Sequence, residues 1–415
     1  MSLTREQVKI IKSTVPVLKK HGIDVTELFY KNVLEEHPDL NNVFNQTNQV
    51  NHHQAGALAG ALYAYAAHID DLGVLSPTME RISQKHASLY IQPEHYAVVG
   101  EGLLRAFGNV LGEAFTPAIQ DAWNSAYWQL ANLMINRETQ LYSESGNWTD
   151  WRDFSIVDKV KESKEITSIY LEPVDHETLP EYLPGQYISL MTDVPHFGYM
   201  QSRQYSLSDA PRSGRYRISV KRAIGLDPHH PEARKSPSWV SNILHDEKQI
   251  GDVVKVSHPA GDFFHDPVED CRIPIVLLSA GVGITPMISI LNTILEHGST
   301  QPVSFIHGAR DTSTQAFGRY VKEQAAMHEN VKATLFVKNV SVNDVAGCDY
   351  DYVGRLNLSE LIQKQGRALY LEDAKTKYFV CGPSTFMSEI RRGLLEVGVE
   401  DSRIKMEVFG TGDLQ

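Results

Sequence analysis

The sequence predicts a multidomain protein in which an all-helical region comes first, an antiparallel β-barrel second and a parallel α/β region third. The chain has 415 residues, which is more than a single hydrophobic core usually serves. Near Trp148 helical periodicity gives way to short β-branched runs between Gly and Pro turns, and from Cys271 onward apolar strands alternate with helical segments. We therefore expect domains at residues 1–147, 148–268 and 269–415.

The composition argues against several classes of protein. A net charge of −12 disfavours a surface for nucleic acid or anionic lipid. No apolar run approaches the roughly 20 residues that span a bilayer, so we expect no integral membrane segment. The three cysteines are odd in number and widely spaced, which fits a reducing compartment without a disulfide framework. A cytoplasmic location is therefore expected.

Capping and proline signals mark the helices of the first region. The basic, amphipathic N-terminus could be a mitochondrial presequence, but its capping box favours the first helix of the fold. We expect helix starts at Thr4, Asp24, Pro93 and Thr116, and a helix end at Pro38.

Two histidines in this region, His86 and His95, are candidate ligands. If Thr78 to Ile91 is a helix, His86 shares an apolar stripe with its neighbours one and two turns away and faces the core. His95 falls off the stripe of the following helix, so we expect it to be solvated. A buried histidine needs a partner.

Tyr96 and Glu138 also lie on apolar stripes, each on a different helix. A buried carboxylate without a partner is costly, so Glu138 should be bonded. With His86 the two residues could form a metal ligand and its supporting shell, in which one imidazole nitrogen donates to Glu138 and the other binds the metal. The alternative is a neutral hydrogen-bond network in the core, and the residues alone leave both open.

A small-residue helix from Gln54 supplies a candidate opposite wall, with Leu58 on the same face. His52 and His53 compete with Gln54 for the polar position over a ligand, and the shared face with Leu58 favours Gln54.

The β-rich region contains a candidate flavin site. One predicted strand carries Arg203 for a pyrophosphate, Tyr205 for a ring and Ser206 for an edge, with Gln204 on the opposite face. The motifs "PGQY" before it and "GDFF" after it strengthen this weak signal. In the loop "GLDPHHPEARKSP", His229 and His230 could bind a metal, although an exposed loop is favoured.

The third region contains a candidate nucleotide site. "GVGITP" follows an apolar strand and opens a helix, where backbone N–H groups can bind a pyrophosphate. It is not the G-x-G-x-x-G fingerprint, and an ordinary strand-to-helix turn is the alternative; the later "CGPSTFM" favours the nucleotide site. The residues concerned are Gly281, Val282, Gly283, Ile284, Thr285 and Pro286.

The whole chain resembles a flavohaemoglobin of the fungal or bacterial type, a globin fused to a ferredoxin-reductase-type module. Its blocks "FYKNVL", "VFNQTNQ", "QKHASLY", "PEHYAVVGEGLL" and "INRETQLY" are similar to those of that family. The resemblance implies that His86 is the proximal haem ligand, with Tyr96 and Glu138 as charge-relay partners. It places Tyr30, Gln54 and Leu58 in the distal pocket, and Phe44 against the haem.

The same resemblance assigns further cofactor contacts. Lys85 and Glu407 would influence the haem potential, whereas sequence alone predicts a solvated Lys85. Tyr187 and the segment Arg203–Ser206 would contact FAD, and the nicotinamide would lie near Cys381, Gly382 and Pro383. A C-terminal segment would cover the flavin. It comprises Glu407, Val408, Phe409, Gly410 and Thr411, the last replacing the proline usual in the family.

The resemblance implies a nitric oxide dioxygenase that uses haem b, FAD and NAD(P)H. NAD(P)H would reduce FAD, FAD would reduce haem, and oxygen held at the haem would convert nitric oxide to nitrate. Alternatives are a haem-based oxygen sensor or store, an NAD(P)H oxidase and a ferric haem reductase or reductase for an external partner. We expect small-molecule partners only and a monomer. Arg310 favours the 2′-phosphate of NADPH and Asp311 opposes it, so the nucleotide preference stays open.

Overall fold

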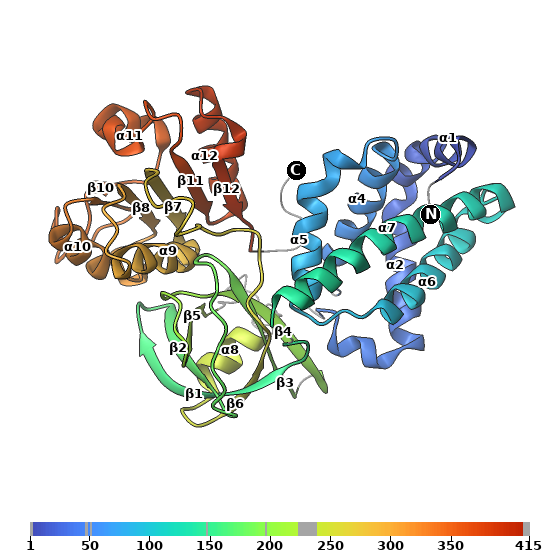
Figure 1. Cartoon of the computed structure of the whole chain (residues 1–415), viewed down its shortest axis with the longest axis horizontal. Helices are drawn as coiled ribbons and strands as arrows, with labels where there is room; N and C mark the ends of the chain where they lie inside the picture. The colour runs from blue at the N-terminus through green and yellow to red at the C-terminus, as the bar shows by residue number, and fades with distance from the viewer. Residues whose placement is uncertain are drawn as a thin grey trace. The chain divides into compact units, whose positions relative to one another are not determined.

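The computed structural model describes residues 3–45, 49, 52–146, 148–195, 197–222 and 239–409 (Figure 1). The chain forms two compact units. Unit 1 comprises Met1–Trp151, Ser189–Arg203 and Ser257–Asp262, and unit 2 comprises Arg152–Ile188, Gln204–Val256 and Phe263–Gln415. The three domain limits given above stay a prediction.

The N-terminal region is helical, as the sequence predicts. Its α-helices are α1 (Arg5–Ser13), α2 (Val15–Glu36), α4 (His53–Ala67), α5 (Ser76–Ala87), α6 (Pro93–Leu111) and α7 (Pro117–Glu144). Short 3₁₀ segments between them are η1 (Pro38–Asn42), η2 (Leu72–Leu75) and η3 (Gly112–Ala114).

Three of the expected helix starts are confirmed and one is wrong. Thr4 makes its capping box, Pro93 is the first residue of α6, and the Thr116 side chain accepts from a backbone N–H of α7. No helix starts at Asp24, because α2 runs unbroken from Val15. The Asp24 carboxylate lies 3.2 Å from Nδ1 of His21 on the exposed side of α2, so it is a surface partner and not a cap.

Helix α5 also ends earlier than the expected helix to Ile91. It stops at Ala87, and Tyr90 adopts a left-handed backbone conformation with a φ of 56°. The Tyr90 ring is buried, and its hydroxyl accepts a hydrogen bond from the backbone N–H of His258 at 3.1 Å, also in unit 1. This tertiary contact accompanies the turn that ends the helix four residues early.

Small residues let α2 and α4 cross closely, as the Gly and Ala pattern of α4 predicts. A Cβ added to Gly22 would lie 3.4 Å from the Cβ of Ala59. Thr26 donates its hydroxyl to the carbonyl of Ala55 at 2.9 Å, which satisfies a buried polar group at the crossing. The crossing sets the distance between the helices that carry Tyr30 and Gln54.

An antiparallel sheet follows the helices. Its strands are β1 (Arg152–Lys161), β2 (Ile166–Pro173), β3 (Tyr187–Val194), β4 (Tyr199–Ser206), β5 (Tyr216–Lys221) and β6 (Val253–Val256), in the order β4-β3-β6-β1-β2-β5. Helix α8 spans Trp239–Asp246. In β1 the buried residues Phe154 and Ile156 are two positions apart, as the period of two requires, whereas β2 buries both Ser168 and Ile169.

The C-terminal module is a parallel sheet with helices on both faces. Its strands are β7 (Ile275–Ala280), β8 (Val303–Ala309), β9 (Val331–Val337), β10 (Tyr352–Val353), β11 (Lys377–Cys381) and β12 (Ile404–Glu407). Its helices are α9 (Ile284–Glu296), α10 (Gly318–Met327), α11 (Leu358–Gln365) and α12 (Ser384–Glu396), with 3₁₀ segments η5 (Gly281–Gly283), η6 (Thr312–Thr314), η7 (Gly366–Leu369) and η8 (Asp401–Arg403).

Two hydrophobic cores lie on opposite faces of this sheet. Ile275 and Leu277 of β7 pack with α9 and α10, whereas Val276 and Leu278 pack with α11 and α12 (Figure 1). Strands buried on both faces are expected to be continuously apolar, which is the pattern of β7. The predicted parallel α/β class is confirmed.

The strand order β10-β9-β8-β7-β11-β12 reverses direction between β7 and β11. After β7 the chain builds the sheet outward through β8, β9 and β10, and it then returns to the other side of β7 as β11. In open α/β sheets ligands bind at such a switch point, beyond the carboxyl ends of the strands. "GVGITP" follows β7 and "CGP" ends β11, so the fold brings both motifs to this point.

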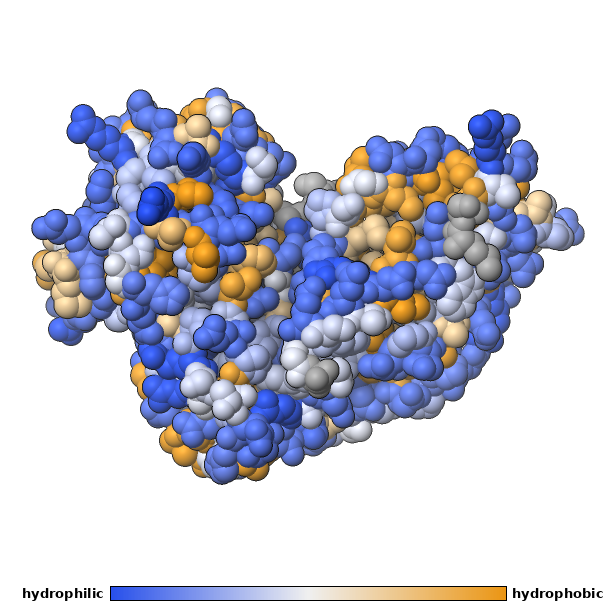
Figure 2. All heavy atoms as spheres, in the orientation of Figure 1, coloured by the Kyte–Doolittle hydropathy of each residue, from blue (hydrophilic) through white to orange (hydrophobic). Residues whose placement is uncertain are grey.

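Among the helices of the described residues, none combines the length and the hydropathy that crossing a lipid bilayer requires. Hydrophilic residues cover most of the face shown in Figure 2, between smaller groups of hydrophobic ones.

Candidate functional site

Three polar side chains from three helices of unit 1 meet as the sequence analysis expected. Nδ1 of His86, on α5, lies 2.8 Å from Oε1 of Glu138, on α7. The hydroxyl of Tyr96, on α6, donates to the same carboxylate oxygen at 2.6 Å and lies 3.0 Å from Nδ1 of His86. Glu138 is only 2% exposed, so its charge is stabilised by these two donors in place of water.

The triad sets the tautomer of the imidazole. Because Glu138 accepts at Nδ1, that nitrogen carries the proton and the lone pair lies on Nε2. The described residues offer Nε2 no hydrogen-bond partner, and 33% of the His86 side chain is exposed. Burial raises the pKa of the Tyr96 phenol, and the charge of Glu138 raises it further, so Tyr96 remains a donor. An imidazole with Nδ1–H engaged and Nε2 accessible fits an iron ligand.

The structure refines the expectation for both histidines. His86 is half-buried and not fully turned into the core, and α5 ends at the next residue. His95 is also half-buried: its Nδ1 accepts from the backbone N–H of Gln92 at 3.0 Å in a capping box at the start of α6. The ring lies at the exposed start of the helix, off the apolar stripe as expected, and it also caps the helix.

Tyr30 and Gln54 form a second polar group in unit 1. Tyr30 is 7% exposed, its ring packs edge-to-face on Phe44 with centroids 5.4 Å apart, and its hydroxyl bonds the Gln54 side chain. Burial raises the pKa of Tyr30, although the bond to Gln54 opposes the shift. Oε1 of Gln54 also accepts from the Gln49 side chain at 3.1 Å.

The histidines that competed with Gln54 lie elsewhere. His52 is exposed, with Nδ1 2.8 Å from Oε1 of Glu27, and His53 is exposed as well. Leu58, one turn after Gln54, packs against the helical core, half-buried. Of the three polar candidates, the structure therefore brings Gln54 to Tyr30.

Lys85 is not the solvated neighbour that sequence alone predicts. It is half-buried, and burial together with the positive charge of Arg203 lowers its pKa to about 8. Arg203, also in unit 1, donates to the carbonyl of Ser202 at 2.7 Å. The charge of Arg203, a residue that the resemblance assigns to FAD, thus acts on Lys85, which it assigns to the haem.

The motifs that flank the candidate flavin strand are in contact through residues of unit 2. Gly185 of "PGQY" has a φ of 113°, and a Cβ there would lie 2.6 Å from the carbonyl oxygen of Phe263 in "GDFF". The backbone N–H of His265 donates to the carbonyl of Pro184 at 3.0 Å. Only glycine permits this conformation and this approach.

Strand β4 carries the candidate flavin contacts Arg203, Gln204, Tyr205 and Ser206. Gln204 and Tyr205 are half-buried, as is Tyr187 at the start of β3. Ser206 is 5% exposed, and its hydroxyl has no hydrogen-bond partner among the described residues. A buried hydroxyl without a protein partner calls for an explanation, and an edge of a bound flavin would provide one. The residues present fit the group.

The two nucleotide motifs are in backbone contact at the switch point. A Cβ added to Gly283 would lie 2.2 Å from the carbonyl oxygen of Cys381, and one added to Gly382 would lie 3.2 Å from the Cβ of Ala280. Gly281 has a φ of 58°. Ile284, Thr285 and Pro286 are buried in the first turn of α9, where the dipole of the helix favours an anion.

Cys381 is fully buried at the end of β11, and Pro383 is the N-cap of α12. Burial raises the pKa of the Cys381 thiol well above its usual value, and the charge of Glu407, which pairs with Cys381 in the sheet, adds to this. Val408 is half-buried and packs against the core, whereas Phe409 is 46% exposed. Gly410 and Thr411, like His229 and His230, lie outside the described residues.

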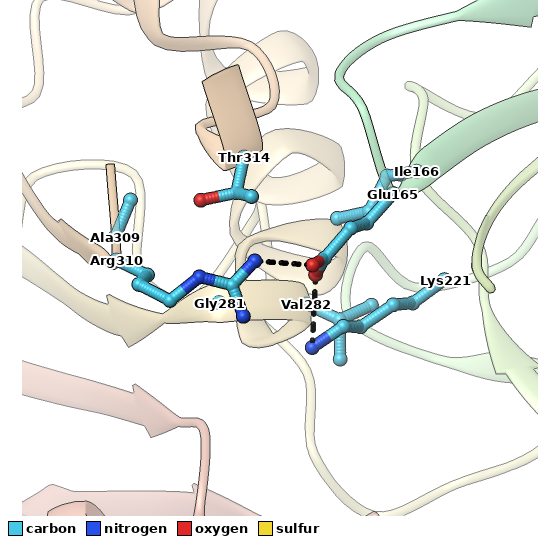
Figure 3. Close-up of a pocket in the computed structure, with 8 residues that line it drawn as sticks. All are labelled: Glu165, Ile166, Lys221, Gly281, Val282, Ala309, Arg310 and Thr314. Atoms are coloured by element: carbon cyan, nitrogen blue, oxygen red, sulfur yellow. Dashed lines mark hydrogen bonds and ion pairs between the residues drawn. The ribbon is translucent and has the colours of Figure 1, made fainter. Parts of the chain in front are cut away.

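Sequence reasoning missed a pocket in unit 2 beside the "GVGITP" turn (Figure 3). The sequence indicates Arg310 as a candidate for binding a 2′-phosphate. It does not indicate Glu165, which contacts Arg310, or Lys221, which contacts Glu165. No local pattern marks either residue. The pocket is lined by Glu165, Ile166, Lys221, Gly281, Val282, Ala309, Arg310 and Thr314.

Sequence reasoning also gave no role to Gln84, which lies two residues before His86. Its Oε1 accepts from the backbone N–H of Gly261 in "GDFF" at 2.9 Å, and both residues belong to unit 1. Ser88 accepts from Ser189 at 2.9 Å in the same unit. Helix α5 is therefore bonded on both sides of His86 to segments outside the helical region.

Comparison with known proteins agrees with this geometry. Residues 27–134 match the globin family model, and residues 277–392 match the oxidoreductase NAD-binding domain. The chain is 46% identical to a flavohemoprotein of Bordetella parapertussis over 99% of each chain. The crystal structure of a flavohemoglobin from Malassezia yamatoensis with bound FAD and heme superposes with a TM-score of 0.84 at 29% identity, covering 99% of this chain and 100% of that one.

The flavohem-like FAD/NAD-binding domain of a nitric oxide dioxygenase from Vibrio cholerae is 35% identical, with a TM-score of 0.54 over 63% of this chain and 99% of that one. A full-length identity of 46% with the Bordetella protein, together with the globin and NAD-binding matches, leaves one assignment. This chain belongs to the flavohemoprotein family.

Proposed function

We propose that the chain is a nitric oxide dioxygenase that consumes NAD(P)H and oxygen and releases nitrate. The observation that carries the proposal is the His86–Tyr96–Glu138 triad in a chain that also holds an oxidoreductase NAD-binding module. The related reductase domain from Vibrio cholerae, which belongs to a nitric oxide dioxygenase, supports the same activity.

The residues that would hold the groups are distinct. His86 would hold haem b through Nε2, the segment Arg203–Ser206 with Tyr187 would hold FAD, and the Gly281–Pro286 turn with Cys381 would hold the nicotinamide nucleotide. When bound, these groups supply hydride acceptance, single-electron transfer and the iron at which oxygen and nitric oxide combine.

Glu138 and Tyr96 act on His86 through Nδ1, the ring nitrogen that would not bind the iron. Glu138 accepts a hydrogen bond from Nδ1–H of His86. This bond raises the electron density at Nε2 and strengthens an imidazole ligand. Tyr96 donates to the same oxygen, which fixes the carboxylate and moderates its charge. The two residues therefore set the orientation and the basicity of His86 without touching a substrate.

Tyr30 and Gln54 supply hydrogen bonds on the other wall. Burial keeps the Tyr30 phenol protonated at neutral pH, so its hydroxyl can donate to a ligand oxygen beside it. Charge-assisted hydrogen bonds contribute about 1.5–3 kcal/mol, which is about one to two decades in affinity. Gln54 orients the hydroxyl, since the two side chains are already bonded.

We further propose a monomer without an obligate protein partner in a reducing, cytoplasmic compartment. The three cysteines support the compartment: Cys271 and Cys348 are exposed, Cys381 is buried, and all are free.

The test is the amount of nitrate formed per NAD(P)H consumed, measured with and without nitric oxide. NAD(P)H gives two electrons and each nitrate from oxygen and nitric oxide needs one, so we expect about two nitrates per NAD(P)H. Peroxide formation at an unchanged rate in nitric oxide would indicate an NAD(P)H oxidase. An absence of NAD(P)H consumption would indicate a sensor or store. Reduction of an external acceptor alone would indicate a reductase.

A further inference from the structure

A buried carboxylate lies between two cations in the pocket beside the nucleotide turn. Glu165 lies just before β2 in the antiparallel sheet, and its side chain is only 8% exposed. Oε1 accepts a hydrogen bond from Arg310, and Oε2 lies 3.4 Å from Nζ of Lys221 (Figure 3). Arg310 comes directly after β8, and Lys221 ends β5. All three residues belong to unit 2.

The position of Arg310 follows from the order of the parallel strands. β8 is the neighbour of β7, with Gly308 paired to Ala280, so Arg310 lies beyond the same carboxyl edge as the Gly281 turn. In folds of this kind the pyrophosphate lies at the turn after the first strand, and the adenosine ribose lies over the end of the neighbouring strand. Arg310 therefore lies where a side chain would contact the 2′ position of the ribose.

At that position an arginine favours a 2′-phosphate, whereas a carboxylate accepts a hydrogen bond from a 2′-hydroxyl. Arg310 is engaged on two sides, by Glu165 and, at 3.4 Å, by Asp311. Asp311 is itself held by Ser313 and the backbone N–H of Thr314. Two carboxylates thus offset the charges of Arg310 and Lys221, and the pocket offers a phosphate dianion no net positive charge.

Glu165 keeps its charge in this setting. Burial opposes its ionisation, but the hydrogen bond from Arg310 and the charges of Lys221 and Arg310 lower the pKa of the carboxyl below its usual value. A carboxylate that is buried, charged and fixed at one end of a pocket can accept from a ribose hydroxyl and repels a phosphate.

We propose that Glu165 determines the nucleotide specificity of this chain: it neutralises Arg310 and selects NADH over NADPH. This inference rests on the proposed function only in that the chain uses a nicotinamide nucleotide as its electron donor. The selecting residue is contributed by the antiparallel sheet and not by the parallel module that binds the rest of the nucleotide.

The experiment compares the full-length holoenzyme with its Glu165→Gln variant. KM for NADH and for NADPH is measured by ferricyanide reduction, and binding of NAD⁺ and NADP⁺ is measured by titration. The substitution keeps the size of the side chain and removes one of the two carboxylates that engage Arg310. We expect KM for NADPH to fall about tenfold, the contribution of one charge-assisted hydrogen bond, and KM for NADH to rise.

Two further variants serve as controls. Glu165→Gln combined with Arg310→Gln should lose the gain for NADPH, because the cation that would bind the 2′-phosphate is gone. Asp401→Asn removes a carboxylate of the same module that does not line the pocket. Its two oxygens each accept from Arg391 at 2.8 Å. This variant should leave the ratio of the two KM values at that of the wild type.

A wild-type preference for NADPH would overturn the proposal, and so would a Glu165→Gln variant with an unchanged ratio of KM values. Ferricyanide reduction needs neither nitric oxide nor the His86 site. Failure of nitrate formation would thus leave this assay intact, and the two proposals fail separately.

Discussion

The triad around His86 and the turn around Gly283 are two sites built by different means. The triad is made of side chains from α5, α6 and α7, joined by hydrogen bonds of 2.6 and 2.8 Å to one carboxylate oxygen. The turn is made of backbone, and Gly283 leaves no room for a Cβ against the carbonyl of Cys381. The first site therefore depends on which side chains are present, and the second on which are absent.

The largest expected effect is on the triad. His86→Ala should abolish stable haem binding, because it removes the atom that would bind the iron and leaves Glu138 buried without one of its two donors. Absorption spectra and haem content of the purified variant measure this. His95→Ala, which removes only a helix cap, should keep the haem spectrum. Loss of haem from the His95 variant instead would show that the ligand is misassigned.

The next largest effect is on the turn. Gly283→Ala should destabilise unit 2 by about 3 kcal/mol or more, because the added Cβ would lie 2.2 Å from a backbone oxygen that cannot move aside. Gly281→Ala is the matched control: nothing lies within 4 Å of its Cβ, and only the φ of 58° costs it about 1–2 kcal/mol. Thermal unfolding of the two variants decides this, and equal losses would contradict the close packing.

A smaller effect is expected at Tyr30. Tyr30→Phe should speed oxygen dissociation about ten- to a hundredfold, by the loss of one charge-assisted hydrogen bond. Stability should also fall by about 1 kcal/mol, because Gln54 loses its hydrogen bond to Tyr30 and keeps the one to Gln49. Nitric oxide turnover should fall most at low oxygen, and reduction of an artificial acceptor should not change.

Stopped-flow oxygen dissociation measures the Tyr30 effect. An unchanged off-rate would mean that the hydroxyl serves Gln54 alone, and the assignment of the distal donor would then pass to Gln54.

The smallest effect is expected at a histidine that, unlike His86, is almost completely buried. His307, on β8, is buried beside Ser279 at 2.9 Å, and burial lowers its pKa to about 4. The unfolded chain protonates this ring near pH 6.5, so between pH 4 and 6.5 it binds more protons than the folded chain. Its contribution is complete above pH 6.5 and is lost as pH falls toward 4, by at most about 1.4 kcal/mol per pH unit.

His307→Gln should therefore reduce the loss of folding stability at acidic pH. The melting temperature of unit 2 measured at pH 7 and at pH 5 should drop less in the variant than in the wild type. Equal drops in the two proteins would mean that other groups account for the acid sensitivity.

The contrast between the two sites also explains what the sequence could predict. Glu138 and Tyr96 stand on apolar stripes, and a polar residue on such a stripe needs a partner, so the triad was predictable from periodicity. Gly283 and Cys381 were predictable as motifs, but their backbone contact depends on the order of β7 and β11, which no local pattern states.

The errors have a common physical cause. Asp24 has the composition of a helix start but pairs with His21 on the surface of a continuous α2. Lys85 has the composition of a solvated residue but lies half-buried near Arg203. Glu165 meets Arg310 across 145 residues of sequence. In each case a tertiary partner decides the environment, and local propensity carries no information about it.

The central claim is that electrons from the nucleotide site reach the iron at His86 within one chain. Anaerobic stopped-flow mixing of the holoenzyme with NADH tests it, with flavin and haem absorbance recorded across a series of protein dilutions. The flavin should be reduced first and the haem second, with a haem rate constant that does not change on dilution. A haem that stays oxidised beside a reduced flavin, or a rate that falls in proportion to protein concentration, would contradict the claim.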